Sequence, residues 1–89
     1  MAAEVKIYTR EYCGYCTAAI SLLRQKGVPF EEIDASGDPK TRAWLASVTR
    51  QSTLPQIFIA GTSIGGFSEL RALDQRGELD ALLAGAPAS

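Results

Sequence analysis

The sequence predicts an α/β fold in which helices flank a four-stranded mixed sheet. In the first half, two strand-like segments at residues 4–9 and 30–34 enclose a segment with helical periodicity. In the second half, the apolar segment 56–60 is followed by a Gly-Thr turn and by a short return strand at 63–64, which indicates a β-hairpin. A strand–helix–strand unit favours parallel strands and a hairpin is antiparallel, so the two together predict a mixed sheet.

The first unit contains a helix whose limits are marked in the sequence. Residues 4–9 alternate polar and apolar side chains, as expected for a strand. The helix that follows is capped at its end by Gly27, and Pro29 forbids its continuation. Its inward face is predicted at positions i, i+3, i+4 and i+7, which are Cys16, Ala19, Ile20 and Leu23.

A second helix is predicted to begin at Asp38 and Pro39. Asp is a favoured N-cap residue and Pro fits the first helical position, where a missing N–H does no harm. The helix runs to about Val48 and directs three apolar side chains inward. These side chains are Trp44, Leu45 and Val48. We therefore interpret Trp44 as a core residue rather than as part of a site.

After the hairpin, Gly65 and Gly66 lead into a helix over about residues 68–74, and a last short helix carries Leu79, Leu82 and Leu83. The resulting order β-α-β-α-β-β-α-α is that of the thioredoxin-like fold. The chain has 89 residues, of which 46% are hydrophobic. We expect one domain over residues 1–85 and a disordered tail over residues 86–89.

The composition excludes several classes of protein. Nine basic and ten acidic residues give a net charge of -1 with no basic block, so we expect no nucleic-acid partner. No apolar run approaches the roughly 20 residues that span a bilayer, so we expect no membrane partner. The first residues do not resemble a secretory signal and the cysteine usage is that of a reducing compartment, so we expect a cytoplasmic location. Because the sequence has no His, a His base, a Cys–His pair and His metal ligands are excluded.

The strongest chemical motif is Cys13-Gly14-Tyr15-Cys16, directly after a predicted strand and at the start of a helix. In a βαβ unit this spacing indicates a redox motif, since cysteines three apart at a helix start are close enough to form a disulfide. A thiol at a helix N-terminus has a pKa below the ordinary value of about 8.5, because the free N–H groups favour the thiolate. Cys13 is therefore the predicted nucleophile, and the more buried Cys16 suits a resolving role.

Two other interpretations of the cysteine pair are open. The residues could be ordinary buried cysteines, or they could form half of a zinc site. A structural zinc site takes four ligands, and this chain has no His and no further Cys to supply them. A disulfide across so short a loop would also stabilise the fold little, which favours a redox role.

Four segments together resemble the glutaredoxin family over nearly the whole chain. They are Tyr8-Thr9-Arg10, the Cys13–Cys16 motif, the segment from Thr53-Leu54-Pro55 to Ile59, and Ile64-Gly65-Gly66 before a helix. The resemblance implies that residues 1–85 form a glutaredoxin domain, a glutathione-dependent thiol–disulfide oxidoreductase that uses Cys13 and Cys16. It implies glutathione as co-substrate, glutathionylated or disulfide-bonded proteins as substrates, glutathione reductase as an indirect partner, no bound cofactor, and a monomer.

The resemblance also implies a glutathione site. Pro55 matches the family's cis-proline, which leaves the backbone of Leu54 free to pair with glutathione. Arg10 and Gln51 match the positions that bind its glycine carboxylate. The alternatives are an ordinary trans proline at a strand start and a solvated loop charge at Arg10.

Further glutathione contacts are implied around the Gly-Gly turn. Gly66, Phe67, Ser68 and Glu69 match the loop and helix start that hold the γ-glutamyl end, with backbone N–H groups on its carboxylate and Glu69 or the Ser68 hydroxyl on its ammonium. The alternative is a capping segment with Ser68 as N-cap. Tyr15 is expected to flank the sulfur, the alternative being a plain exposed aromatic side chain.

Some positions depart from the common family pattern. Gly14 stands where Pro is usual, Phe67 replaces a frequent cysteine, and Leu54 replaces Val. Glutaredoxins with a small residue at the position of Gly14 include carriers of a [2Fe–2S] cluster, so cluster binding by a glutathione-ligated dimer through Cys13 is the alternative function. A thioredoxin proper is a third interpretation, but thioredoxins usually carry Trp where this sequence has Tyr12.

Overall fold

A computed structural model of the chain describes residues 3–85 and confirms the predicted order of elements. Every predicted strand and helix is present, with ends that differ by only one or two residues from those expected from the sequence. The elements are β1 (Val5–Thr9), α1 (Gly14–Gln25), β2 (Glu31–Asp34), α2 (Pro39–Thr49), β3 (Gln56–Ile59), β4 (Thr62–Gly65), α3 (Phe67–Gln75) and α4 (Leu79–Leu83).

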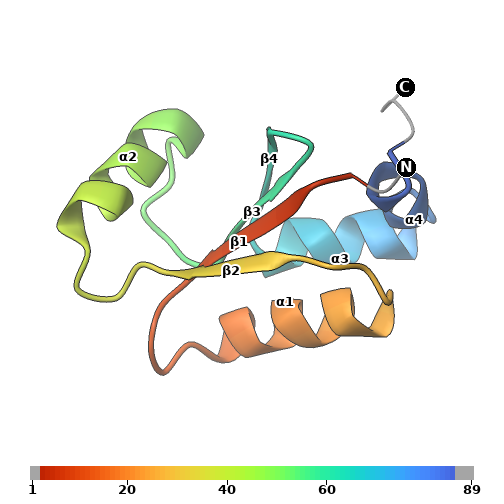
Figure 1. Cartoon of the computed structure of the whole chain (residues 1–89), viewed down its shortest axis with the longest axis horizontal. Coiled ribbons are helices and arrows are strands. Elements are labelled where there is room, and N and C mark those ends of the chain that lie inside the picture. The colour runs from red at the N-terminus through yellow and green to blue at the C-terminus, as the bar shows by residue number, and fades with distance from the viewer. Residues whose placement is uncertain (1–2, 86–89) are drawn as a thin grey trace.

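Within the described residues, the four strands form one mixed sheet in the order β2-β1-β3-β4. β1 runs parallel to β2 and antiparallel to β3, and β3 forms the predicted hairpin with β4. Helices α1 and α3 lie on one face of the sheet and α2 lies on the other (Figure 1). The predicted mixed sheet with helices on both faces is therefore confirmed.

The core lies between the central strands of the sheet and the helices α1 and α3, which cover one of its faces. Ile7 of β1 is paired with Ile57 of β3, and both side chains are fully buried. Burial of each such side chain stabilises the fold by about 1.5–3 kcal/mol. The buried apolar cluster consists of Val5, Ile7, Ala19, Leu23, Ile57, Ile59, Leu70, Leu79 and Leu83.

Helix α1 is anchored in this core by the face that the sequence predicts. Cys16, Ala19 and Leu23 are buried, whereas Ile20 is only partly buried. The helix ends at Gln25, and Gly27 follows with a φ of 70°, which is the left-handed conformation typical of a residue just beyond a helix. Because α1 is fixed along its length, the position of its N-terminus relative to the sheet is also fixed.

Helix α2 differs from the prediction in how it packs. Of the three side chains expected to face inward, only Leu45 is buried, while Trp44 is 48% exposed and Val48 is exposed to a similar degree. The Trp44 ring stacks on Phe58 and also contacts Tyr8, with centroids 5.9 and 5.8 Å away. An indole is too large to bury fully against a single sheet face, so it covers the strands and leaves one edge in water. The prediction that Trp44 and Val48 face inward as core residues is therefore wrong, and that for Leu45 is confirmed.

A small ion-pair network joins the C-terminal end of α1 to the last two helices. Lys26 pairs with Asp74 of α3 and with Asp80 of α4. These two carboxylates raise the pKa of Lys26 above its ordinary value, chiefly through their hydrogen bonds. Lys26 and Asp74 are half-buried and Asp80 is exposed, so water still screens both pairs and their contribution to stability is modest.

The disordered tail predicted for residues 86–89 lies outside the described residues. No helix among residues 3–85 is long and apolar enough to cross a membrane.

The start of α2 can be tested through Asp38. Its carboxylate accepts hydrogen bonds from the Thr41 N–H and hydroxyl, and these bonds lower the pKa of Asp38 below 3.8. A lowered folded-state pKa means that the cap stabilises the fold above the unfolded pKa and loses its effect as the pH falls through the folded pKa. We expect Asp38→Ala to lower the urea midpoint of unfolding at neutral pH, by an amount that shrinks in acid.

The matched control is Asp38→Asn, which keeps a capping oxygen without the charge and is expected to unfold much closer to the wild type at neutral pH. Equal urea midpoints for the wild type and Asp38→Ala at neutral pH would show that this cap does not hold α2.

Candidate active site

The two cysteines lie together at the N-terminal end of α1, as the motif predicts. Cys13 is the N-cap residue, and its Sγ accepts a hydrogen bond from the Cys16 N–H at 3.1 Å. The Cα atoms are 5.2 Å apart and the two sulfurs are joined in a disulfide. Cys13 is 7% exposed and Cys16 is 3% exposed, in the order expected for an attacking and a resolving thiol.

The position of Cys13 determines what its sulfur can do after reduction. The first N–H groups of a helix have no partner within the helix, so they form an anion site. In α1 one of these groups, the Cys16 N–H, already points at the Cys13 sulfur. The same contact that caps the helix therefore stabilises a thiolate, the species that attacks disulfides.

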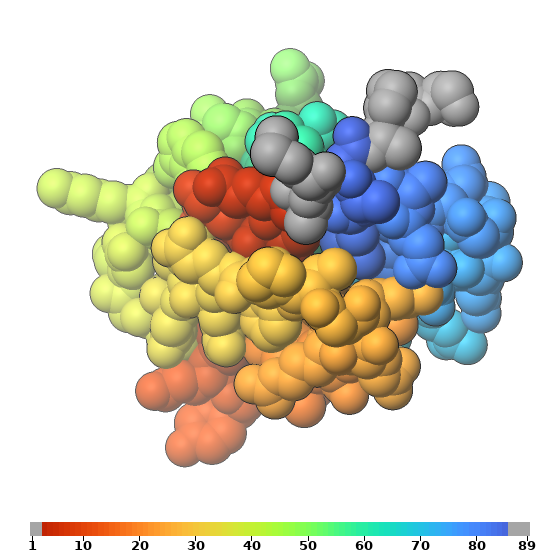
Figure 2. Space-filling model, turned by 45° about the vertical axis from the view of Figure 1, so that its right-hand side comes forward, coloured from red at the N-terminus to blue at the C-terminus, as the bar shows by residue number. Residues whose placement is uncertain are grey.

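The loop between β1 and α1 holds Cys13 in this position. Arg10 Nη1 donates to the backbone carbonyls of Glu11 and Tyr12, at 3.0 and 3.3 Å, and the Glu11 N–H donates to Ser36 Oγ. Tyr12 has a φ of 54° and is 97% exposed. In Figure 2 the red-orange segment that includes the start of α1 projects from the lower left of the molecule. The loop that leads to Cys13 is thus exposed at its tip, whereas Cys13 and Cys16 are themselves buried.

Pro55 follows a cis peptide bond, as the family resemblance implied. The cis bond lies at the end of the loop between α2 and β3. This loop faces the cysteines, since the Leu54 carbonyl oxygen lies 3.7 Å from Cys13 Sγ. The β1–β3 ladder begins only at Gln56, so Leu54 lies outside the pairing of the sheet. Its backbone is consequently placed beside the reactive sulfur without being part of a strand.

A groove of ≈ 820 Å³ brings together the nine residues for which a role in glutathione binding was predicted. They come from three segments that are far apart in the sequence, and the fold makes them neighbours. Their individual roles remain predictions. The groove is lined by Arg10, Tyr15, Arg50, Gln51, Ser52, Thr53, Leu54, Pro55, Gly66, Phe67, Ser68 and Glu69.

Three lining residues were missed in the sequence, namely Arg50, Ser52 and Thr53. Arg50 adopts a left-handed φ of 58° at the end of α2, which turns the chain back toward the cysteines. Its place between a predicted helix end and Gln51 is the signal that could have identified it. With Arg50 the described lining of the groove contains two basic residues, Arg10 and Arg50, and one acidic residue, Glu69.

Helix α3 starts differently from the capping alternative considered above. Gly66, not Ser68, is the N-cap residue, and its N–H donates to Glu69 Oε1 at 2.9 Å. Ser68 lies within the first turn, where backbone N–H groups are free to meet an anion. Nearby, the Tyr15 ring stacks on Phe67 with centroids 6.2 Å apart, so Tyr15 forms part of the groove wall although it is well exposed.

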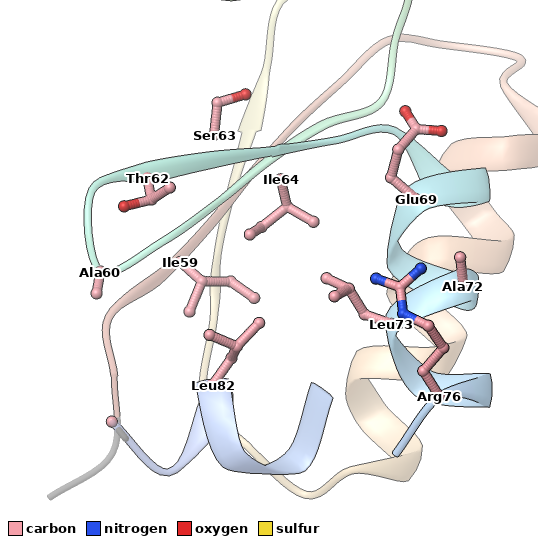
Figure 3. Close-up of a pocket in the computed structure, with 11 residues that line it drawn as sticks. Ile59, Ala60, Thr62, Ser63, Ile64, Glu69, Ala72, Leu73, Arg76 and Leu82 are labelled. Carbon is pink, nitrogen blue, oxygen red and sulfur yellow. The ribbon is translucent and has the colours of Figure 1, made fainter. Parts of the chain in front are cut away.

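A second cavity, of ≈ 610 Å³, lies between the β3–β4 hairpin and helices α3 and α4 (Figure 3). It is mainly apolar, with Ile59, Ile64, Leu73 and Leu82 among its lining residues, and it shares only Glu69 with the groove. Neither cysteine is among the described residues that line the two cavities, but the groove includes Leu54, whose carbonyl oxygen lies 3.7 Å from Cys13 Sγ. Both of its charged side chains are engaged within the chain, because Arg76 pairs with Glu78 and Glu69 accepts from Gly66. We therefore place the candidate active site in the groove beside Cys13.

A helix-capping cysteine that is paired one turn later and faces a cis-proline defines a thiol–disulfide oxidoreductase. A family model for glutaredoxin matches residues 5–64. A glutaredoxin from Pseudomonas aeruginosa is 49% identical over 79 residues, which cover 89% of this chain and 94% of that protein. The chain belongs to the glutaredoxin family.

Solved structures show the same fold. The solution structure of a glutaredoxin from Brucella melitensis matches with a TM-score of 0.87 and 44% identity, covering 98% of this chain and 96% of that one. The crystal structure of a buckwheat glutaredoxin–glutathione complex matches with a TM-score of 0.87 and 29% identity, covering 97% and 83% of the two chains. The predicted thioredoxin-like fold is therefore confirmed.

The wall of the groove at the start of α3 can be tested with Gly65→Ala. Gly65 has a φ of 110°, and an added Cβ would lie 2.5 Å from Glu69 Oε1, the atom that holds the Gly66 N–H. We expect unfolding measurements in urea to give a loss of about 1–3 kcal/mol, from the unfavourable backbone and the displaced carboxylate.

Gly14→Ala is the matched control, because no atom lies within 4 Å of its added Cβ and its φ is not left-handed. Its free energy of unfolding should stay within about 1 kcal/mol of the wild type. Equal losses in the two variants would contradict the tight fit described at Gly65.

Proposed function

We propose that this protein reduces protein–glutathione mixed disulfides with Cys13 as nucleophile and glutathione as the thiol that completes the cycle. The observation that carries the proposal is the placement of Cys13 Sγ. It receives the Cys16 N–H from the helix side and lies 3.7 Å from the Leu54 carbonyl, and Leu54 lines the groove. A ligand whose sulfur lies beside Leu54 in the groove would therefore have that sulfur close to Cys13 Sγ, the attacking atom.

The chemistry of the groove fits glutathione, which carries two carboxylates and one ammonium at neutral pH. Arg10, Arg50 and Gln51 offer donors to one carboxylate, and the first turn of α3 offers free N–H groups to the other. Glu69 Oε1 is engaged with Gly66, which leaves its second carboxylate oxygen for the ammonium. The buckwheat relative of the same fold was solved as a glutathione complex, which supports the same ligand here.

In the proposed cycle, the Cys13 thiolate attacks the glutathione sulfur of a mixed disulfide. The bond between that sulfur and the protein sulfur breaks, and the protein thiolate leaves with the electron pair. Cys13 then carries glutathione until a second glutathione thiolate attacks the same glutathione sulfur. Oxidised glutathione forms and the Cys13 thiolate is restored, so no electrons are gained or lost by the enzyme over the cycle.

Cys16 gives the same site a second route for disulfides between protein cysteines. After Cys13 forms a mixed disulfide with such a substrate, the Cys16 thiolate attacks Cys13 Sγ and releases the reduced substrate. The Cα separation of 5.2 Å suits the resulting Cys13–Cys16 disulfide. Glutathione then reduces that disulfide.

Cluster binding has less support. Residues 3–85 contain no group of three or more His, Cys, Asp or Glu side chains placed to hold a metal ion. A [2Fe–2S] cluster would therefore need thiolates from outside the chain, with Cys13 as this chain's ligand. No contact described above favours that assembly over thiol exchange, so disulfide reduction remains the proposed function.

The proposal is tested with a glutathionylated protein substrate in an assay coupled to glutathione reductase. We expect Cys13→Ser to lower the rate at least about 100-fold, because it removes the nucleophile. Cys16→Ser should keep most of this activity, since glutathione itself resolves the intermediate, yet should lose activity on a substrate with an intramolecular disulfide.

A wild-type protein that is folded but inactive on both substrates would overturn the proposal. A Cys13→Ser variant as active as the wild type would also overturn it. Cys16 is the only other cysteine of the sequence, so Cys16 would then have to be the nucleophile. A brown protein that absorbs visible light after anaerobic purification, with no reductase activity, would favour the cluster alternative.

A further inference from the structure

Gln56 is a buried polar residue that none of the roles above explains. It is the first residue of β3, directly after the cis-proline, and its side chain is fully buried. Its Nε2 donates two hydrogen bonds, to the Thr53 carbonyl at 2.9 Å and to Gln51 Oε1 at 3.0 Å. Both partners line the groove. Gln56 therefore connects the sheet to the loop that forms one wall of the groove.

These two hydrogen bonds determine the orientation of the side-chain amides of Gln56 and Gln51, that is, where the nitrogen and the oxygen of each amide lie. A backbone carbonyl only accepts hydrogen bonds, so the atom of Gln56 that faces Thr53 must be the nitrogen. The second hydrogen on that nitrogen needs an acceptor, and Gln51 meets it with its oxygen. The Gln51 NH₂ group is consequently turned away from Gln56. Thr53 thus sets the orientation of Gln56, which in turn sets that of Gln51.

The backbone of Gln51 is held as well. Its N–H donates to the Thr49 hydroxyl at 3.2 Å, at the end of α2. No hydrogen bond within the described part of the chain uses Gln51 Nε2. Gln51 also lines the groove together with Arg10 and Arg50. An amide NH₂ that is fixed in direction, in a groove that two arginines also line, offers a donor suited to a carboxylate.

The remaining atom of Gln56 gives independent support for a functional role. Gln56 Oε1 is buried and has no partner among the described residues. A buried acceptor without a partner destabilises a protein by about 1–3 kcal/mol, and an apolar side chain of similar size would avoid that loss. A glutamine here therefore has no advantage for packing. Its advantage lies in the two donated bonds and in what they position.

We propose that Gln56 is a positioning residue that orients the Gln51 amide so that its NH₂ group donates to the glycine carboxylate of glutathione. This inference rests on the proposed function, because it specifies how that ligand is recognised. Gln56 itself does not line the groove, so it acts through the residues that it holds, and of these Gln51 carries the free side-chain NH₂ group. Without it, the Gln51 amide turns freely and presents its oxygen to the carboxylate part of the time, which repels the ligand.

The test uses Gln56→Leu, Gln51→Ala and the double variant, each in the full chain, with KM for glutathione, kcat and urea unfolding measured for all. Gln56→Leu should raise the KM for glutathione by about tenfold, the effect of one charge-assisted hydrogen bond, and should leave kcat within about twofold. Its stability should match or exceed that of the wild type. In the double variant, KM should equal that of Gln51→Ala alone, because both substitutions remove the same contact.

Assays with a second thiol substrate distinguish a loss of carboxylate recognition from a general disturbance of the groove. γ-Glutamylcysteine lacks the glycine carboxylate, so the wild type and Gln56→Leu should have the same KM for it. If Gln56→Leu does not fold, Gln56→Met keeps the apolar character with an unbranched side chain and serves in its place.

Three results would overturn the inference while the wild type remains active. They are an unchanged KM for glutathione in Gln56→Leu, effects of the two substitutions that add in the double variant, and an equal rise in KM for γ-glutamylcysteine. An inactive wild type would instead overturn the proposed function, so the two failures are distinguishable.

Discussion

The hydrogen bond from the Cys16 N–H to Cys13 Sγ is the interaction on which the chemistry of this protein depends. It exists because Cys13 occupies the one position where a side chain can cap α1. The helix is in turn held by Ala19 and Leu23, which are buried against the central strands. The packing of the core thus places a sulfur where unpaired backbone N–H groups stabilise its negative charge, and no His or metal ion is needed for that.

The opposite wall of the groove depends on the pairing of β1 with β3. Tyr8 is paired with Gln56, so the strand that leads to the cysteines and the strand that follows the cis-proline are fixed side by side. The Leu54 backbone is thereby set next to Cys13, and the Gln56 amide holds the loop that carries Gln51 and Thr53. One strand pair therefore connects the reacting sulfur to the surface that recognises its ligand.

Patterns of local origin were predictable from the sequence, and contacts between distant segments were not. The strands, the Asp38 cap and the cysteine motif follow from neighbouring residues, and they were confirmed. Periodicity alone cannot tell how much of a helical side chain the sheet covers, which is why Trp44 was predicted to be a core residue although it is 48% exposed. The amide chain from Gln56 to Gln51 depends on side-chain directions after a cis bond, which no sequence pattern encodes.

The most direct test of the account compares how fast iodoacetamide alkylates the fully reduced protein and free glutathione at slightly acidic pH. Because only thiolates react, the rate reports the thiolate population at each sulfur. The account predicts that Cys13 reacts first and faster than the glutathione thiol, since the N-terminus of α1 stabilises its thiolate. A Cys13 that reacts no faster than glutathione, or a Cys16 that reacts before it, would contradict the central claim.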